Sequence, residues 1–226
     1  MTTHLALPRV GHLEQLFHVF GYLKEEPKRK ISFDPDHMFI DEQRFKKHEW
    51  YNFYCNAKEA ITGDMPPPRG NGVTTYFFGD ADLVGNTVTR RSRKVILIFI
   101  NRTPIIWHSK RQNTVEVSTY GSEIVAMKNA VEFIEALWYK LRMFGVPIDG
   151  TTNIFCDNEA VTKNFLDPTS MLKKKHHSIA YHSNREAVAA GTCRITKEYT
   201  DTNLSYLFTK LLSKIRREDL LNKFTY

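Results

Sequence analysis

The sequence lacks the features of membrane, secreted and disulfide-bonded proteins. No stretch approaches the roughly 18 consecutive apolar residues of a membrane-spanning helix, and the longest apolar run, Val95–Ile100, has the length of a strand. The three cysteines lie far apart, which indicates reduced thiols and excludes a disulfide framework or a cysteine zinc module. The first residues show no basic patch followed by an apolar stretch, so no secretory signal is expected.

Aromatic residues and basic charge, by contrast, are plentiful. The 226 residues include 15 Phe and 10 Tyr, enough for a packed globular core. The net charge is +7, and it is concentrated in residues 170–226, where Lys and Arg outnumber Asp and Glu by eleven to five. A basic end suits a polyanionic partner such as nucleic acid, although a solvated helical face has the same composition.

The pattern changes at residues 65–72, whose Pro and Gly content predicts a linker. Before it, residues 9–26 have helical periodicity and residues 28–64 are irregular. After it, short β-rich runs alternate with helical segments, as in an α/β domain with helices on a mixed sheet. We expect strands at 73–79, 95–100, 104–108, 151–157 and 192–199, and helices at 119–144, 158–166, 172–190 and from 202 onward. The expected units are a helical and irregular segment (1–72), an α/β domain (73–212) and a basic helical tail (213–226).

Three carboxylates occupy positions suited to a shared site. Asp80 and Asp157 each lie at the carboxyl end of an expected strand, where ligands bind in α/β sheets. Glu123 lies in the first turn of the long helix, on its otherwise apolar face. Three acids that meet there require a cation, and hard oxygen ligands favour Mg²⁺ or Mn²⁺. Two such ions side by side support hydrolysis of a phosphodiester. Alternatively, the acids cap turns and helices.

Five motifs occur in the order found in one family of proteins. Residues 107–126, WHSKRQNTVEVSTYGSEIVA, resemble the signature W-S-S-K-K-Q…V-x-x-S-S-x-E-A-E-Y-x-A of the ribonuclease H domain in copia-type LTR retrotransposon polyproteins. DAD (80–82) with VTRRS (88–92) resembles D-A-D…T-R-R-S, and FCDN (155–158) resembles Y-C-D-N. Residues 174–186 resemble T-K-H-I-D-I-R-Y-H-F-V-R-E, and residues 200–210 resemble T-E-D-Q-L-A-D-I-L-T-K. A weaker match, residues 12–24, resembles the helix that follows the reverse transcriptase core.

The resemblance implies a ribonuclease H-like fold, a mixed five-stranded sheet with helices on its faces, preceded by a remnant of the polymerase connection region. It further implies cleavage of RNA in an RNA–DNA hybrid with two Mg²⁺ or Mn²⁺ ions. Asp80, Glu123 and Asp157 carry over as catalytic metal ligands. The implied partners are a hybrid or other nucleic acid and a reverse transcriptase polymerase domain, without a membrane. The implied location is the cytoplasm, a virus-like particle or the nucleus.

The fourth carboxylate of the family does not carry over. Its position falls at Tyr206, and a neutral phenol cannot replace a carboxylate on Mg²⁺ because its pKa is near ~10. Asp201 lies one turn or more upstream and is a weak substitute. Two hypotheses therefore stay open: a metal-dependent ribonuclease of reduced activity, or an inactive relic that binds nucleic acid or serves as a connection-like module.

Further residues are candidates for nucleic-acid contacts, and one histidine group raises the question of zinc. Asn158 lies beside the carboxylates, and exposed phosphate contacts are expected from Arg90, Arg91, Lys110 and Lys174. Solubilising charge is the alternative for each basic residue. A zinc site built on His176, His177 and His182 is not expected, because His177 and His182 lie on poorly matched helix faces and no cysteine pair is near.

Overall fold

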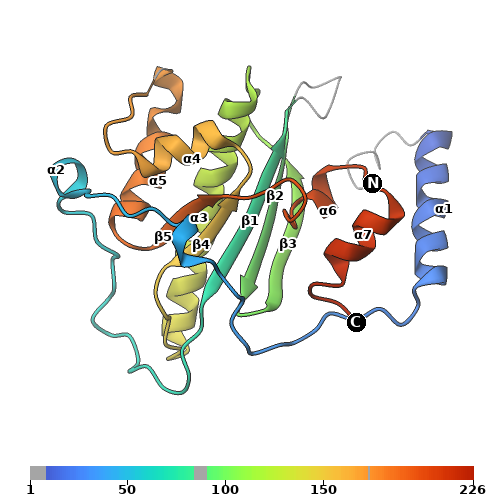
Figure 1. Ribbon diagram of the computed structural model, residues 1–226, viewed down its shortest axis with the longest axis horizontal. Helices are drawn as coiled ribbons and strands as arrows, with labels where there is room; N and C mark the ends of the chain where they lie inside the picture. Colours follow the sequence, from blue (N-terminus) through green and yellow to red (C-terminus); the bar gives the residue numbers. More distant parts are fainter. Residues whose placement is uncertain (1–8, 84–90, 173) are drawn as a thin grey trace.

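The computed structural model describes residues 9–83, 91–172 and 174–226 (Figure 1). None of the helices in this part of the chain is long and apolar enough to cross a bilayer. The helices are α1 (Val10–Glu25), α2 (Tyr51–Tyr54), α3 (Thr119–Met143), α4 (Glu159–Leu166), α5 (Ser178–Ala189), α6 (Tyr206–Thr209) and α7 (Lys214–Leu221). The strands are β1 (Thr75–Asp82), β2 (Arg93–Ile100), β3 (Thr103–Arg111), β4 (Thr152–Cys156) and β5 (Cys193–Lys197). The 3₁₀ turns are η2 (Glu42–Arg44) and η3 (Lys175–His177).

The five strands form one mixed sheet in the order β3-β2-β1-β4-β5. Strand β2 runs antiparallel to both of its neighbours, β1 and β3. Strand β4 runs parallel to both of its neighbours, β1 and β5. Figure 1 shows α3, α4 and α5 on one side of the sheet and α6 and α7 on the other. This arrangement confirms the ribonuclease H-like fold class expected from the sequence.

Alternation of apolar side chains along the strands explains why both faces of the sheet are covered. In β1, Phe77 joins the cluster under α3, α4 and α5, while Tyr76 and Phe78 join the cluster under α6 and α7. In β2, Ile96 and Ile98 face the first cluster, and the residues between and after them face the second. A strand buried on both faces needs a continuous apolar run, which is what residues 95–100 supply.

Several element boundaries differ from the sequence expectation; β3, for example, runs to Arg111 instead of residue 108. β1 continues past Gly79 to Asp82, so Asp80 lies inside the strand near its end. The helix expected from residue 172 begins at Ser178, because the buried Arg185 donates to the carbonyls of Pro168 and Ser170 and holds that segment as a loop. The helical region expected from residue 202 is interrupted between α6 and α7, where the Ser213 hydroxyl accepts a hydrogen bond from the Arg216 amide and caps α7.

The segment before the expected linker packs partly on the sheet. Phe45 is buried in the cluster under α6 and α7, and Met38 and Ile40 pack against that cluster. The Arg194 guanidinium on β5 pairs with Glu42, and the Arg44 guanidinium pairs with Glu198. Helix α1, in contrast, has no buried residue within the described chain. The domain boundaries at residues 72 and 212 stay a prediction.

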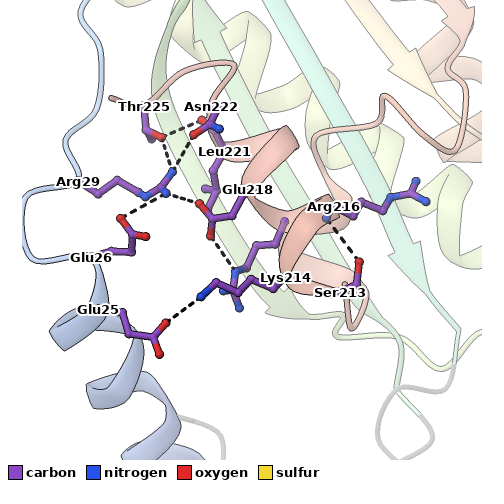
Figure 2. Close-up of polar contacts among 11 residues, drawn as sticks. Glu25, Glu26, Arg29, Ser213, Lys214, Arg216, Glu218, Leu221, Asn222 and Thr225 are labelled. Atoms are coloured by element: carbon purple, nitrogen blue, oxygen red, sulfur yellow. Dashed lines mark hydrogen bonds and ion pairs between the residues drawn. The ribbon is translucent and has the colours of Figure 1, made fainter.

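An N-terminal strap, residues 29–32, is tied to the C-terminal residues after α7 (Figure 2). The Lys30 and Tyr226 amides donate to each other's carbonyls at 2.9 and 3.0 Å, and Ile31 forms a β-bridge with Thr225. The Arg29 guanidinium pairs with Glu218 and donates to the Thr225 hydroxyl and the Asn222 amide oxygen. The N-terminal strap and the residues after α7 therefore hold each other in place.

Removal of the Arg29 side chain is expected to destabilise this closure. We expect Arg29→Ala to lower the free energy of unfolding by about 1–3 kcal/mol, because a half-buried carboxylate loses its charge-assisted partner. Lys214→Ala is the control: its pair with Glu25 is exposed, with 68% and 63% side-chain exposure, so its expected effect is below ~1 kcal/mol. Urea denaturation of both variants measures the difference, and equal effects would contradict the assignment of a stabilising role to Arg29.

Candidate functional site

The three predicted acids meet at one end of the sheet. Gly79 of β1 is paired with Cys156 of β4, so the next residues along these parallel strands, Asp80 and Asp157, are neighbours. Glu123 reaches them from α3: one carboxylate oxygen each of Glu123 and Asp157 and the Cys156 sulfur lie within 4.8 Å of one another. Asp80 is 4% exposed, and its charge raises the pKa of both other acids. The structure thus brings together the residues that the sequence singled out.

Glu123 is held by the segment that follows β4. The Asn158 side-chain amide donates to Glu123 Oε1 at 3.0 Å, while Cys156 Sγ lies 3.7 Å from Oε2. The Asn158 side-chain oxygen Oδ1 accepts from the Ala160 and Val161 amides and caps α4. Burial, and secondarily the nearby acidic charges, raise the pKa of Glu123 to about 8. In the metal-free protein Glu123 therefore keeps its proton at neutral pH.

This raised pKa makes stability depend on pH in a defined direction. Folded Glu123 holds its proton up to about pH 8, whereas the ordinary value is 4.5. Between these values the folded state binds more protons, so the free energy of unfolding falls as the pH rises through the window. We expect the free energy of unfolding of the wild type to fall by on the order of 2 kcal/mol between pH 5 and pH 8.5. The Glu123→Gln variant is expected to lack this fall. Urea denaturation in EDTA tests this, and parallel pH profiles for both proteins would contradict it.

Tyr206, at the degenerate fourth position, and its neighbour Thr209 contact two of the acids directly. The Tyr206 hydroxyl donates to Asp157 Oδ2 at 2.6 Å, and the Thr209 hydroxyl donates to Asp80 Oδ2 at 2.5 Å. The Lys210 ammonium lies 3.5 Å from the same Asp80 oxygen. Burial and the bond to Asp157 raise the pKa of Tyr206, so the phenol stays neutral. One side of the cluster is therefore filled by side chains of α6 and the residue that follows it.

Asp201 does not replace the missing acid. Its side chain is 86% exposed and pairs with the Arg216 guanidinium at 3.0 Å. This ion pair holds the carboxylate on the surface.

The donor atoms that remain fit a hard divalent cation. Asp157 Oδ1 is buried and has no hydrogen-bond partner among the described residues, although its other oxygen accepts from Tyr206. Burial, and secondarily the charge of Asp80, raise the pKa of Asp157 in spite of the opposing effects of the Tyr206 hydroxyl and Lys210. An unpartnered buried carboxylate oxygen beside Glu123 and Asp80 offers the ligand type that Mg²⁺ or Mn²⁺ takes.

The basic candidates lie around the same end of the sheet. Lys110 of β3 pairs in register with Lys94 of β2, beside the end of β1, and is exposed. Arg91 is half-buried just before β2. The Lys174 ammonium donates to the hydroxyl of Ser118, the N-cap of α3, at 3.3 Å. Arg90, the remaining candidate, lies outside the described residues.

Comparison with known proteins gives a consistent set of relatives. No protein-family model matches the chain. It is 26% identical over 155 residues to the retrovirus-related Pol polyprotein from transposon RE2 of Arabidopsis thaliana, covering 69% of this chain and 11% of that polyprotein. It is also 26% identical over 161 residues to the corresponding polyprotein from transposon TNT 1-94 of Nicotiana tabacum. The chain is therefore similar to retrovirus-related Pol polyproteins over about two thirds of its length.

The chain spans about a tenth of the length of the polyproteins that it matches. Among solved structures, it is similar to LC11-RNase H1 in a complex with an RNA/DNA hybrid, with a TM-score of 0.45 and 12% identity. That similarity covers 57% of this chain and 88% of the other. The sheet order and the similarity to Pol polyproteins support the ribonuclease H-like domain that the sequence motifs imply.

Three residues at the site were not predicted from the sequence. Thr209 and Lys210 contact Asp80, and Cys156 lies beside Glu123. The signal was present for the first two, because they end the motif that resembles T-E-D-Q-L-A-D-I-L-T-K. For Cys156, only its place one residue before Asp157 pointed to the site.

Proposed function

We propose that this domain is a divalent-metal-dependent nuclease that cleaves the RNA strand of RNA–DNA hybrids, with reduced activity. The observation that carries the proposal is the convergence of Asp80, Glu123 and Asp157, with one buried Asp157 oxygen left without a partner in the described chain. The resemblance of five ordered motifs to a family with this activity supports the same assignment. Two acids at the carboxyl ends of parallel strands, together with a third from helix α3, suit the hydrolysis of a phosphodiester.

In this proposal the three acids bind the metal, and two neighbouring side chains position them. Asp80, Glu123 and Asp157 would hold Mg²⁺ or Mn²⁺, which when bound supplies charge stabilisation on phosphorus and a more acidic water. Asn158 orients Glu123 through its amide, and Tyr206 fixes Asp157 through its hydroxyl. Binding of the cation must displace the Glu123 proton, so we expect the apparent metal affinity to rise with pH up to about 8.

The substrate surface would lie across the same end of the sheet. Arg91 before β2, Lys110 on β3 and Lys174 beside the N-cap of α3 would offer cationic groups for phosphates of the bound strands. A hybrid is recognised through its shape and 2′-hydroxyl groups, so little base preference is expected.

A second candidate function is binding of nucleic acid without cleavage. The observation that favours it is the filled fourth position. There Tyr206 contacts Asp157, and Thr209 and Lys210 contact Asp80. The second of the two expected ions would lack a carboxylate there. A binding module keeps the basic surface but needs no complete set of metal ligands.

Strand-specific cleavage separates the two functions. A hybrid labelled on either the RNA or the DNA strand is incubated with the chain in Mg²⁺, in Mn²⁺ and in EDTA. The nuclease proposal expects shortening of the RNA label alone, and only with a metal. An intact hybrid that is nevertheless bound would support the binding module, while cleavage in EDTA or of the DNA strand would refute the metal-dependent ribonuclease.

A further inference from the structure

A second group of potential metal ligands lies where the start of α3 meets the turn before α5. Glu116 precedes the N-cap of α3, and His176 and His177 lie in the 3₁₀ turn η3. One ligand atom of each residue lies within 4.8 Å of the other two. The side chains of His177 and Glu116 are 2% and 7% exposed, whereas His176 is exposed. The cluster contains none of the three acids of the candidate nuclease site.

The buried histidine nitrogen points at the carboxylate without bonding to it. His177 Nε2 lies 3.5 Å from Glu116 Oε2 and has no hydrogen-bond partner within the described part of the chain. A buried polar atom left in this state is unfavourable. Two ligand atoms that share one tetrahedral Zn²⁺ at about 2.0–2.2 Å lie about 3.3–3.5 Å apart. The observed separation suits a shared ion better than a direct hydrogen bond.

A glycine leaves room beside both ligand atoms. A methyl group added at Gly121, in the first turn of α3, would lie 2.8 Å from Glu116 Oε2 and 2.9 Å from His177 Nε2. Position 121 holds Glu, and position 177 holds Ile, in the family signatures quoted above. The open space and the buried ligand are therefore departures of this chain from those signatures.

The protonation states suit metal binding. Burial lowers the pKa of His177, with smaller effects in the same direction from His176 and Lys174, and only Glu116 acts against it. The ring is therefore neutral near pH 7, the form that coordinates metals. Glu116 supplies the negative charge, and two imidazoles with one carboxylate are a ligand set typical of Zn²⁺.

We propose that Glu116, His177 and His176 bind a divalent transition cation of the Zn²⁺ class. Glu116 and His177 are buried and already face each other, and the exposed His176 turns inward to complete the set. The ion joins the η3 turn to the start of α3 and so fixes the neighbouring Lys174 beside Ser118. No zinc site that includes His182 was expected from the sequence, and in the structure His182 Nδ1 lies 2.6 Å from the Tyr54 hydroxyl.

Co²⁺ is the probe, because it replaces Zn²⁺ and absorbs visible light strongly when its site is tetrahedral. Co²⁺ is titrated into the chain in excess Mg²⁺, which occupies the carboxylate site. We expect one Co²⁺ per chain, displaced by Zn²⁺, and at least a tenfold loss of affinity in both His177→Ile and Glu116→Gln. His18→Asn, on the exposed helix α1, is the matched control and keeps the affinity.

Two further variants control for poor folding of the ligand variants and for Co²⁺ binding at the nuclease site. Gly121→Ala keeps every ligand and fills the space beside them, so it is expected to weaken Co²⁺ binding even if a histidine variant folds poorly. Asp157→Asn, which alters only the nuclease site, is expected to leave the Co²⁺ spectrum unchanged. Absence of the Co²⁺ band in the wild type, or equal affinity in wild type and His177→Ile, would overturn the proposal. None of these readouts depends on nuclease activity.

Discussion

Asp80→Asn is expected to lower the metal-dependent cleavage rate by at least ~100-fold while the protein stays folded. The substitution keeps the size of the side chain and an oxygen that can accept from the Thr209 hydroxyl. It removes the negative charge of Asp80, which acts on Glu123 and Asp157 and would bind the cation with them. Because that charge also raises the pKa of Glu123, the variant is expected to be at least as stable as the wild type without metal. Single-turnover cleavage and urea denaturation measure the two effects.

Asp201→Asn is the matched control for this prediction. It removes one carboxylate from the same basic molecule, but from an exposed position paired with Arg216. Its cleavage rate should equal that of the wild type. A rate that survives in Asp80→Asn would remove Asp80 from the site, and a loss in Asp201→Asn would reinstate Asp201 as the fourth ligand.

Tyr206→Asp is expected to raise the cleavage rate by on the order of tenfold or more. The new carboxylate would stand beside Asp80 and Asp157, where the phenol now donates a hydrogen bond, and would add the ligand that a second ion needs. The substitution is also expected to cost stability without metal, because it buries a fourth acid and removes an aromatic ring from the cluster under α6 and α7. Mg²⁺ should restore part of that stability.

Tyr206→Phe separates the two consequences of this change. It removes the hydroxyl bond to Asp157 and adds no charge, so it should leave the rate at or below that of the wild type. Equal rates in Tyr206→Asp and the wild type would place the defect elsewhere, for example in the ion pair between Lys210 and Asp80.

Much of the fold was accessible from the sequence because the relevant patterns are local. The continuous apolar run of β2 and the long periodic helix α3 show their structure within a few residues. Asp80 and Asp157 could be placed together because residues at the ends of parallel strands meet at one edge. The apolar face of the long helix added Glu123 to the same site, and the ordered motifs supported all three acids.

The remaining features depend on contacts between distant segments, which local patterns do not encode. The start of α5 was placed too early because the loop before it is held by Arg185, whose role is visible only in three dimensions. The bond between Tyr206 and Asp157 joins residues 49 positions apart. The proximity of Glu116 and His177 likewise depends on the packing of α3 against η3; the sequence pattern did not single out Glu116 and predicted no zinc site at His177.

A crystal soaked in Mn²⁺ tests the central claim most directly, because anomalous scattering locates the ion without reference to activity. The account predicts a peak coordinated by Asp80, Glu123 and Asp157, and no equally strong peak beside Tyr206. In Asp80→Asn crystals the peak should fall sharply. Absence of a peak among the three acids at saturating Mn²⁺ would contradict the assignment of this cluster as a metal-dependent nuclease site.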